Sequence, residues 1–310
     1  MSRIRATLGK STFSTPVFAA SGCFGYAYEM AEFSDIPRIG AISPKSVTKE
    51  PRKGNPPPRL WHGVGIQSSP IGLQNPGIEA YVEEKVPLIK SVCRPDQILV
   101  SIAGGCIEDY VYNVEQIINA FGEDGFAAVE INAVCPNVSV GGSSFSKVPG
   151  DLACLVRAVR PLVKKNTLII KIITCFDSFL DAAKAAEDSG ADVIFAANNA
   201  MGMIIDVENQ RPYFSTGRSG LEGAAFLPIG VFKVWDIFNA VNIPIISSGG
   251  IRDIDGALQY FMAGASAVAL GSVIFMDPML PATLPDELDK WLEGKGIAHY
   301  SQIIGAAHNN

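Results

Sequence analysis

Cys135 is the residue of this chain best placed to do chemistry. Residues 128–138 read AVEINAVCPNV, so the cysteine follows a β-branched, apolar run that ends in polar residues. Such a run is typical of a buried parallel strand that delivers side chains to the rim of a sheet. A thiol on that rim could transfer a proton, whereas most cysteines are buried structural residues. The local pattern leaves both roles open.

Two lysines occupy comparable places. Lys45 follows an apolar run in ISPKS, and Lys171 lies inside the run LIIKII. Either could be a solvated loop charge, but burying a lysine among aliphatic side chains without a partner costs several kcal/mol. We therefore interpret Lys171 as functional. One alternative is a Schiff-base lysine in an aldolase-type barrel that binds a sugar phosphate.

Glycines close the last two apolar runs, in SSGGIRD and ALGS. Gly249, Gly250, Gly271 and Ser272 could expose backbone N–H groups to an anion, because glycine has no side chain to block a close approach. Tight turns alone would explain either pair. Two such pairs after adjacent strands favour a phosphorylated ligand. The chain has no G-x-G-x-x-G after its first run and no Walker pattern, which argues against a nicotinamide cofactor or ATP.

The elements that would position these residues are eight short apolar runs separated by helix-compatible segments. The runs cover residues 17–20, 41–43, 98–102, 127–132, 168–173, 193–197, 243–247 and 267–270, and helices are expected over 178–189, 229–240 and 254–263. This alternation predicts an α/β fold, a (β/α)8 TIM barrel, with the active site at the carboxyl ends of the strands. A two-domain doubly wound protein is the structural alternative. No linker is evident, so a single domain over 1–310 is expected.

Composition narrows the function classes. The chain is 48% hydrophobic and 18% charged, which provides enough apolar material for a large core. A net charge of −6 without a basic cluster argues against nucleic-acid binding. No segment has the character of a signal peptide or membrane span, so we expect a cytoplasmic protein with no membrane contact. Six cysteines without a CxxC pair and only three histidines predict no metal site.

Taken in order, the motifs resemble those of class 1 dihydroorotate dehydrogenases. They are ASG at 20–22, PKS at 44–46, GNPPPR at 54–59, IGLQNPG at 71–77, SIAG at 101–104, NAVCPN at 132–137, SSGG at 247–250 and AGASAVALGS at 263–272. IGLQNPG and CPNV point to the class 1B catalytic subunit. The resemblance implies an FMN-containing barrel that oxidises dihydroorotate to orotate in pyrimidine biosynthesis. It also implies a homodimer and, for class 1B, a second subunit with FAD and an iron–sulfur cluster that uses NAD; class 1A relatives use fumarate.

The resemblance carries over to individual positions. Those resembling the family's FMN contacts are Ala20, Ser21, Lys45, Ser46, Asn132, Lys171, Gly223, Gly249, Gly250, Gly271 and Ser272. Those resembling its substrate contacts are Lys45, Ser69, Ile71, Gly72, Leu73, Asn75, Asn132, Asn137, Asn198 and Asn199. Lys45 and Lys171 would place positive charge near the flavin ring.

Cys135 resembles the family's catalytic base, which removes a proton from C5 of dihydroorotate while hydride leaves C6. A thiol is only slightly ionised near neutral pH, so its surroundings must assist the proton transfer. Residues 136–150, rich in Gly and Ser, are the expected active-site loop, although an ordinary connection would have the same composition.

Several positions depart from the family pattern. Ser69 replaces an asparagine, Asn199 replaces a serine or threonine, Val134 replaces the serine before the cysteine, and Thr174 stands where the family has a proline. A site built on hydrogen bonds discriminates strongly, so these changes could retune substrate choice. The alternatives are an FMN enzyme for another cyclic substrate such as a dihydropyrimidine, the Schiff-base lyase, and a barrel that binds its ligand without turnover.

Overall fold

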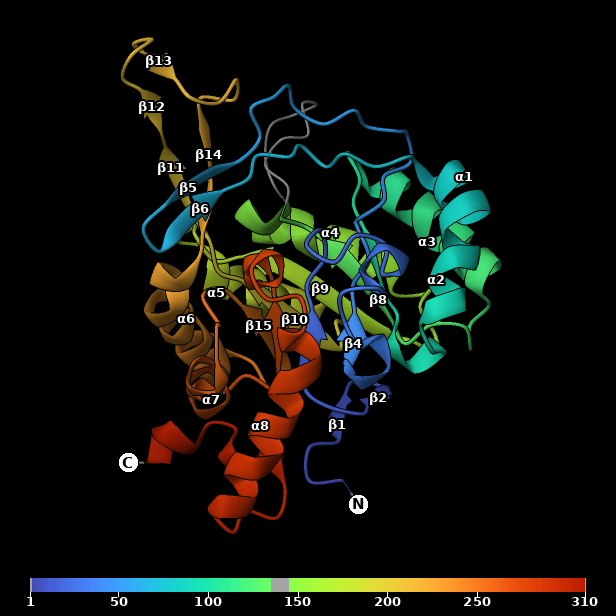
Figure 1. Ribbon diagram of the computed structural model, residues 1–310. Coiled ribbons are helices and arrows are strands. Elements are labelled where there is room, and N and C mark those ends of the chain that lie inside the picture. Colours follow the sequence, from blue (N-terminus) through green and yellow to red (C-terminus); the bar gives the residue numbers. More distant parts are fainter. Residues whose placement is uncertain (1, 135–144, 310) are drawn as a thin grey trace.

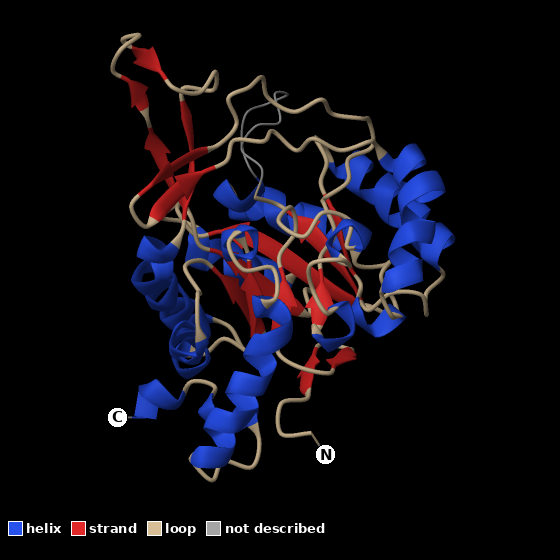
Figure 2. Cartoon of the chain, viewed as in Figure 1, coloured by secondary structure: helices blue, strands red, loops and turns tan. Residues whose placement is uncertain are grey.

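Eight parallel strands form the centre of the protein (Figures 1 and 2). The computed structural model describes residues 2–134 and 145–309. The strands are β3 (Val17–Ala19), β4 (Ala41–Ile42), β7 (Leu99–Ile102), β8 (Ala128–Asn132), β9 (Thr167–Ile173), β10 (Val193–Ala197), β15 (Ile245–Ser248) and β16 (Ala267–Leu270). Their order is β4-β3-β16-β15-β10-β9-β8-β7, and parallel bridges Ile42–Ile98 and Val47–Ile102 join the two ends. The predicted (β/α)8 barrel is confirmed.

Helices surround the barrel. They are α1 (Ile78–Ala80), α2 (Val86–Val92), α3 (Ile107–Phe121), α4 (Pro149–Val159), α5 (Phe179–Asp188), α6 (Leu227–Ala240), α7 (Ile254–Ala263) and α8 (Leu280–Gly294), with a π-helical turn at Tyr81–Lys85 between α1 and α2. The three predicted helices correspond to α5, α6 and α7 within two residues at each end. The side chain of Asp253 caps α7 by accepting the Gly256 N–H at 2.9 Å, and Gly264 ends it at φ +121°.

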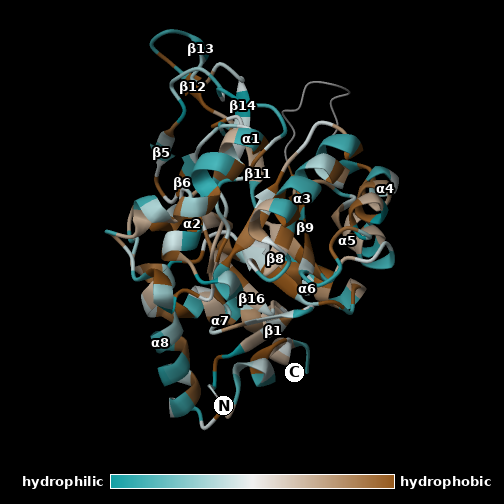
Figure 3. Cartoon of the chain, turned by 90° about the vertical axis from the view of Figure 1, so that its right-hand side faces the viewer, coloured by the Kyte–Doolittle hydropathy of each residue, from teal (hydrophilic) through white to brown (hydrophobic). Residues whose placement is uncertain are grey.

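The barrel strands are buried on both faces, which explains why they appear in the sequence as continuous apolar runs. All seven residues of β9 and all five of β8 are buried. Figure 3 shows the barrel strands around β9 largely in the brown of hydrophobic residues, whereas the surrounding helices mix teal and brown residues. Glu130 in β8 and Lys171 in β9 are the charged residues in this layer. Among the described residues, no helix has the length and apolar character needed to cross a bilayer.

An antiparallel arm projects beyond the carboxyl ends of the barrel strands (Figure 1). It contains β5 (Trp61–Gly63), β6 (Ile66–Ser68), β11 (Ala200–Met203) and β14 (Arg218–Glu222) in the order β11-β14-β6-β5, with the hairpin β12 (Ile205–Asp206) and β13 (Arg211–Pro212) at its tip. No pattern in the sequence predicted this arm. Its strands are short and partly exposed, so they lack the apolar runs of the barrel.

Smaller elements complete the fold. A hairpin of β1 (Ala6–Leu8) and β2 (Ser11–Phe13) lies near the N-terminus. Short 3-10 turns occupy Tyr28–Met30, Ile36–Arg38, Pro95–Gln97, Phe145–Lys147, Ala224–Phe226, Ser272–Phe275, Tyr300–Ile303 and Ala306–Asn309. Of the expected loop 136–150, residues 136–144 lie outside the described residues. The rest is largely helical, because Phe145–Lys147 form a 3-10 turn and Pro149 begins α4.

Candidate active site

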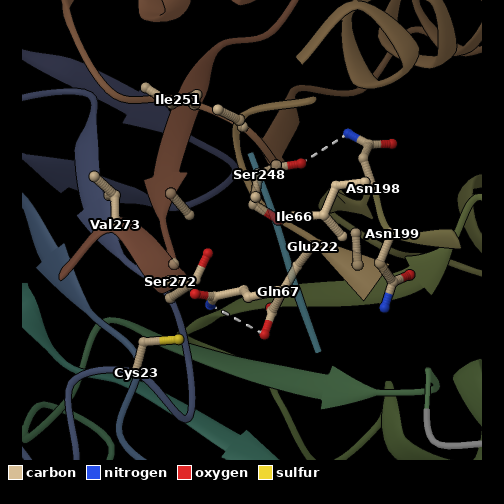
Figure 4. Close-up of a pocket in the computed structure, with 18 of the residues that line it drawn as sticks. Cys23, Ile66, Gln67, Asn198, Asn199, Glu222, Ser248, Ile251, Ser272 and Val273 are labelled. Atoms are coloured by element: carbon tan, nitrogen blue, oxygen red, sulfur yellow. Dashed lines mark hydrogen bonds between the residues drawn. The ribbon is translucent and has the colours of Figure 1, made fainter. Parts of the chain in front are cut away.

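Two adjoining cavities lie where the barrel strands end and the arm begins. The first has a volume of about 390 Å³ and the second about 980 Å³. Ser21, Cys23, Val134, Asn199 and Glu222 line both cavities, so the two form one continuous site. Figure 4 shows Cys23, Asn199 and Glu222 among the side chains that line the first cavity. Both cavities therefore lie at the edge of the barrel where the sequence predicts the active site.

Nine of the eleven predicted cofactor residues line the first cavity. They are Ala20, Ser21, Asn132, Lys171, Gly223, Gly249, Gly250, Gly271 and Ser272. Lys45 lines the second cavity instead. Ser46 is buried and lines neither cavity; its hydroxyl accepts a hydrogen bond from the Asn132 amide nitrogen at 3.0 Å and lies 2.8 Å from the Ser101 hydroxyl. Ser46 thus fixes the orientation of Asn132.

The glycine loop after β15 has a backbone that other residues could not adopt. Gly249 and Gly250 have φ +121° and +79°, and a Cβ on Gly250 would lie 2.4 Å from the backbone nitrogen of Leu227. The N–H groups of Gly249, Gly250 and Ser272 donate to no backbone acceptor in the described part of the chain. Arg252 lines the same cavity. Free N–H groups beside a guanidinium fit a phosphate.

Lys171 and Glu130 form a buried ion pair beneath the first cavity. The Lys171 ammonium lies 3.4 Å from Glu130 Oε1, donates to Ser21 Oγ at 3.0 Å and lies 4.3 Å from the ring centroid of Phe195. Glu130 is fully buried, and it also accepts hydrogen bonds from Ser101 at 2.8 Å and Ser43 at 3.3 Å. The carboxylate therefore compensates the charge of a lysine that would otherwise be costly to bury.

Two of the predicted substrate residues use their amides within the protein. Asn198 Oδ1 accepts from Thr174 Oγ1 at 2.7 Å, while its Nδ2 donates to Ser247 Oγ and to the Ser248 carbonyl. Asn75 Oδ1 accepts the N–H groups of Thr48 and Gly77. Asn198 still lines the first cavity, whereas Asn75 lines neither. Both amides hold the ends of loops in place.

The remaining predicted substrate positions divide between the cavities. Lys45, Ser69, Ile71, Gly72, Leu73 and Asn199 line the second cavity, and Asn132 lines the first. The Asn199 Oδ1 atom is buried and has no hydrogen-bond partner among the described residues. Cys135 and Asn137 lie outside the described residues. The described neighbour Val134 lines both cavities, so the chain reaches the site just before Cys135.

Several charged or reactive residues at this site were not predicted from the sequence, among them Arg252, Glu130, Cys23 and Glu222. Glu130 had a detectable signal, because a glutamate inside AVEIN is as unusual as the lysine inside LIIKII. Cys23 follows the ASG motif. Burial raises the pKa of the Cys23 thiol to about 12; the Glu222 carboxylate also raises it, while Lys171 and Lys45 lower it. Glu222 lies on the unpredicted arm, so no local pattern indicated it.

No cluster of His, Cys, Asp and Glu suited to a metal ion occurs among residues 2–134 and 145–309. The donor set instead combines free backbone N–H groups, Arg252, the buried Lys171 and the amide of Asn132 around one cavity. This set fits a phosphorylated, planar, electron-accepting group, because cations and hydrogen-bond donors stabilise negative charge on both its phosphate and its ring.

Comparison with known proteins identifies the family. The family model described as dihydroorotate dehydrogenase matches residues 3–292. The chain belongs to the dihydroorotate dehydrogenase family. It is 40% identical over 306 residues to the dihydroorotate dehydrogenase B (NAD(+)) catalytic subunit of Bacteroides thetaiotaomicron, with 99% of each chain covered. It is also 40% identical over 305 residues to the subunit of the same name from Geobacillus kaustophilus, covering 98% of this chain and 96% of that protein.

The resemblance to class 1B dihydroorotate dehydrogenases is thus confirmed. Members of the family are flavin-dependent oxidoreductases that act on a CH–CH bond, and this chain is such an enzyme. A dihydroorotate dehydrogenase from Eimeria tenella, solved in complex with ferulenol, has the same fold, with a TM-score of 0.78 and 20% identity over 100% of this chain and 90% of that one. The relatives give no support to a Schiff-base lyase or to another cyclic substrate.

Proposed function

We propose that this chain is the FMN-containing catalytic subunit that oxidises dihydroorotate to orotate in pyrimidine biosynthesis. The main support is the convergence of the glycine loop, Arg252 and the buried Lys171 on one cavity that opens into a second cavity lined by Lys45. The first cavity has groups for a phosphate and a ring that becomes anionic. The second has a cation for the carboxylate of dihydroorotate.

When bound, FMN supplies the acceptor for the hydride that leaves C6 of dihydroorotate. Lys171 would hold a positive charge beside the ring, and Glu130 and Ser21 fix its ammonium in one position. Asn132, oriented by Ser46, would present its amide to the same region. Gly249 and Gly250 would bind the phosphate through their backbone N–H groups.

We assign the role of general base to Cys135, which would take the proton from C5 of dihydroorotate. Support comes from the NAVCPN motif and from the position of Val134 on both cavities. The thiol must be deprotonated as it reacts, so its surroundings must assist the proton transfer. Residues 136–150, of which 136–144 lie outside the described residues, remain the proposed active-site loop.

We also propose the assembly that the family resemblance implies. The chain would form a homodimer in the cytoplasm, each copy a single domain over 1–310, and would pass electrons to a second subunit with FAD and an iron–sulfur cluster that uses NAD. Two relatives of the B type at 40% identity support this proposal over fumarate as the acceptor.

Anaerobic bleaching of the bound flavin by dihydroorotate tests the function. The protein is mixed with dihydroorotate, and in parallel with dihydrouracil and dihydrothymine, while visible absorbance is followed. We expect rapid bleaching by dihydroorotate alone. A flavin that ignores dihydroorotate would contradict the proposed substrate, and release of a flavin other than FMN on denaturation would contradict the proposed cofactor.

A further inference from the structure

Glu222 is a carboxylate at the junction of the two cavities that no motif in the sequence predicted. It is the last residue of β14, where it pairs with Gln67 of β6 in an antiparallel ladder. It lines both cavities, and Figure 4 shows its carboxylate beside Gln67, to which a hydrogen bond joins it. The arm therefore delivers a negative charge to a site whose barrel side carries Lys171 and Lys45.

Only one of the two carboxylate oxygens of Glu222 is used within the described part of the chain. Oε1 accepts hydrogen bonds from Ser69 Oγ at 2.5 Å and from Gln67 Nε2 at 3.3 Å. These two contacts fix the carboxylate in one orientation. Oε2 has neither a hydrogen bond nor a cation within 4 Å among those residues. A fixed carboxylate with a free oxygen can accept a further donor.

The Asn199 side chain provides a second hydrogen-bond acceptor that has no donor, in addition to the free oxygen of Glu222. Its Oδ1 is buried and unpartnered among the described residues, and the residue lines both cavities. In the antiparallel pair of β11 and β14, Ala200 lies opposite Leu221 at the end of the ladder. Asn199 and Glu222 are the next residues along the two strands beyond this pair. Buried polar atoms are nearly always hydrogen-bonded in native proteins. A buried acceptor without a donor, together with the free carboxylate oxygen of the partly exposed Glu222, indicates a ligand that carries N–H donors.

The charges around Cys23 show the polarity of the site. The Glu222 carboxylate raises the pKa of its thiol, and the Lys171 and Lys45 ammonium groups lower it, so all three act on the same small volume. A ligand with a carboxylate and ring N–H groups would be oriented by this field, with its carboxylate toward the lysines and its N–H groups toward the arm.

We propose that Glu222 is a substrate-binding residue whose free carboxylate oxygen accepts a hydrogen bond from a ring N–H of the cyclic ureide, with Asn199 Oδ1 as the neighbouring acceptor. This inference rests on the proposed function. The hydrogen bond from Ser69 explains why a serine is suitable where the family has asparagine: it orients the carboxylate that contacts the substrate. The pyrimidine half of a flavin is also a ureide, so the test must separate the two ligands.

The test compares binding of orotate and of its N1-methyl and N3-methyl derivatives to the FMN-loaded enzyme, read from the change in flavin absorbance. The proteins are the parent, Glu222→Ala, Glu222→Gln, and the control Glu208→Gln, which changes an exposed carboxylate at the tip of the same arm. In the parent and the control, we expect methylation of one ring nitrogen to weaken binding by about tenfold or more, as loss of a hydrogen bond to a charged group would.

In Glu222→Ala the same methyl group should cost less than about twofold, because the acceptor is already gone. Glu222→Gln keeps one acceptor oxygen and should give an intermediate penalty. Equal methyl penalties in the parent and both variants would overturn the inference. Loss of FMN from the variants with unchanged methyl penalties after reconstitution would overturn it too, and would assign the carboxylate to the flavin. A parent that binds no orotate and is not bleached by dihydroorotate overturns the proposed function and this inference together.

Discussion

Replacing Glu130 by glutamine should destabilise the barrel far more than removing an exposed carboxylate. Glutamine has the same shape, and its amide oxygen can accept from Ser101 while its NH2 group faces the Ser43 hydroxyl, so the change removes the negative charge and one of the two acceptors. Lys171 then remains as a cation whose side chain is only 10% exposed. Removing one partner of a buried ion pair typically lowers the free energy of unfolding by about 3–5 kcal/mol.

Two other contacts of Lys171 reduce this cost. Its ammonium keeps the hydrogen bond to Ser21 Oγ and the position 4.3 Å from the Phe195 ring. We therefore expect the lower end of the range, about 3 kcal/mol in the free energy of unfolding. With a urea m-value of about 3 kcal/mol/M for a chain of this size, the midpoint should fall by about 1 M. The assay is urea unfolding of the flavin-free protein, because bound flavin would add its own free energy.

Glu123→Gln is the matched control. Glu123 and Lys165 are 3.0 Å apart, closer than the buried pair, but their side chains are 36% and 60% exposed. Exposed pairs contribute about 0–1 kcal/mol, so this midpoint should hardly move. The double variant Glu130→Leu with Lys171→Met should recover most of the stability, because it leaves no unpaired charge. Equal midpoint shifts for Glu130→Gln and Glu123→Gln would refute the reasoning.

Three further predictions concern the site itself. Gly250→Ala should purify with little or no flavin, because the new Cβ would strain a backbone at φ +79°. The control Gly294→Ala, in which no atom lies within 4 Å of the added Cβ, should retain its full complement of flavin. The raised pKa of about 12 keeps the Cys23 thiol neutral at pH 7.5, so mass spectrometry should find it unmodified by iodoacetamide when the exposed Cys154 is alkylated. Cys135→Ala should retain FMN and lose most of its turnover with dihydroorotate.

Each of these predictions has a result that contradicts it. A yellow Gly250→Ala protein with normal flavin content would show that the loop does not hold the phosphate. Alkylation of Cys23 as fast as Cys154 would show that its thiol is neither buried nor beside a carboxylate. Equal turnover in the Cys135→Ala variant and the parent would reject the cysteine as the base.

The barrel itself was predictable because its signal is local. A strand buried on both faces must be apolar along its whole length, so runs such as residues 168–173 can be recognised without knowing their neighbours. The end of α7 at Gly264 is likewise set by one residue with φ +121°. The arm has no such signal, since β12 and β13 have two residues each and are largely exposed.

The site could be predicted only in part, because only some of its residues have a local signal in the sequence. The glycine loop and Lys171 stand out by residue type, and the motif resemblance added the other positions. Neither residue type nor burial reveals which asparagine amides already have hydrogen-bond partners within the protein. Asn198 and Asn75 bond to neighbouring groups, whereas the Oδ1 atom of Asn199 has no donor among the described residues. That difference depends on how loops pack against one another.

The sequence by itself determined the order of strands and helices, the glycines that adopt left-handed backbone, and the family to which the chain belongs. The tertiary structure alone decided the partners of the charged groups. Ser69 and Glu222 are 153 positions apart, and Lys171 and Glu130 are 41 apart on adjacent strands. Conformational preferences depend on a residue and its near neighbours in the sequence. Hydrogen bonds and ion pairs, in contrast, form between whichever groups the fold brings within about 3 Å.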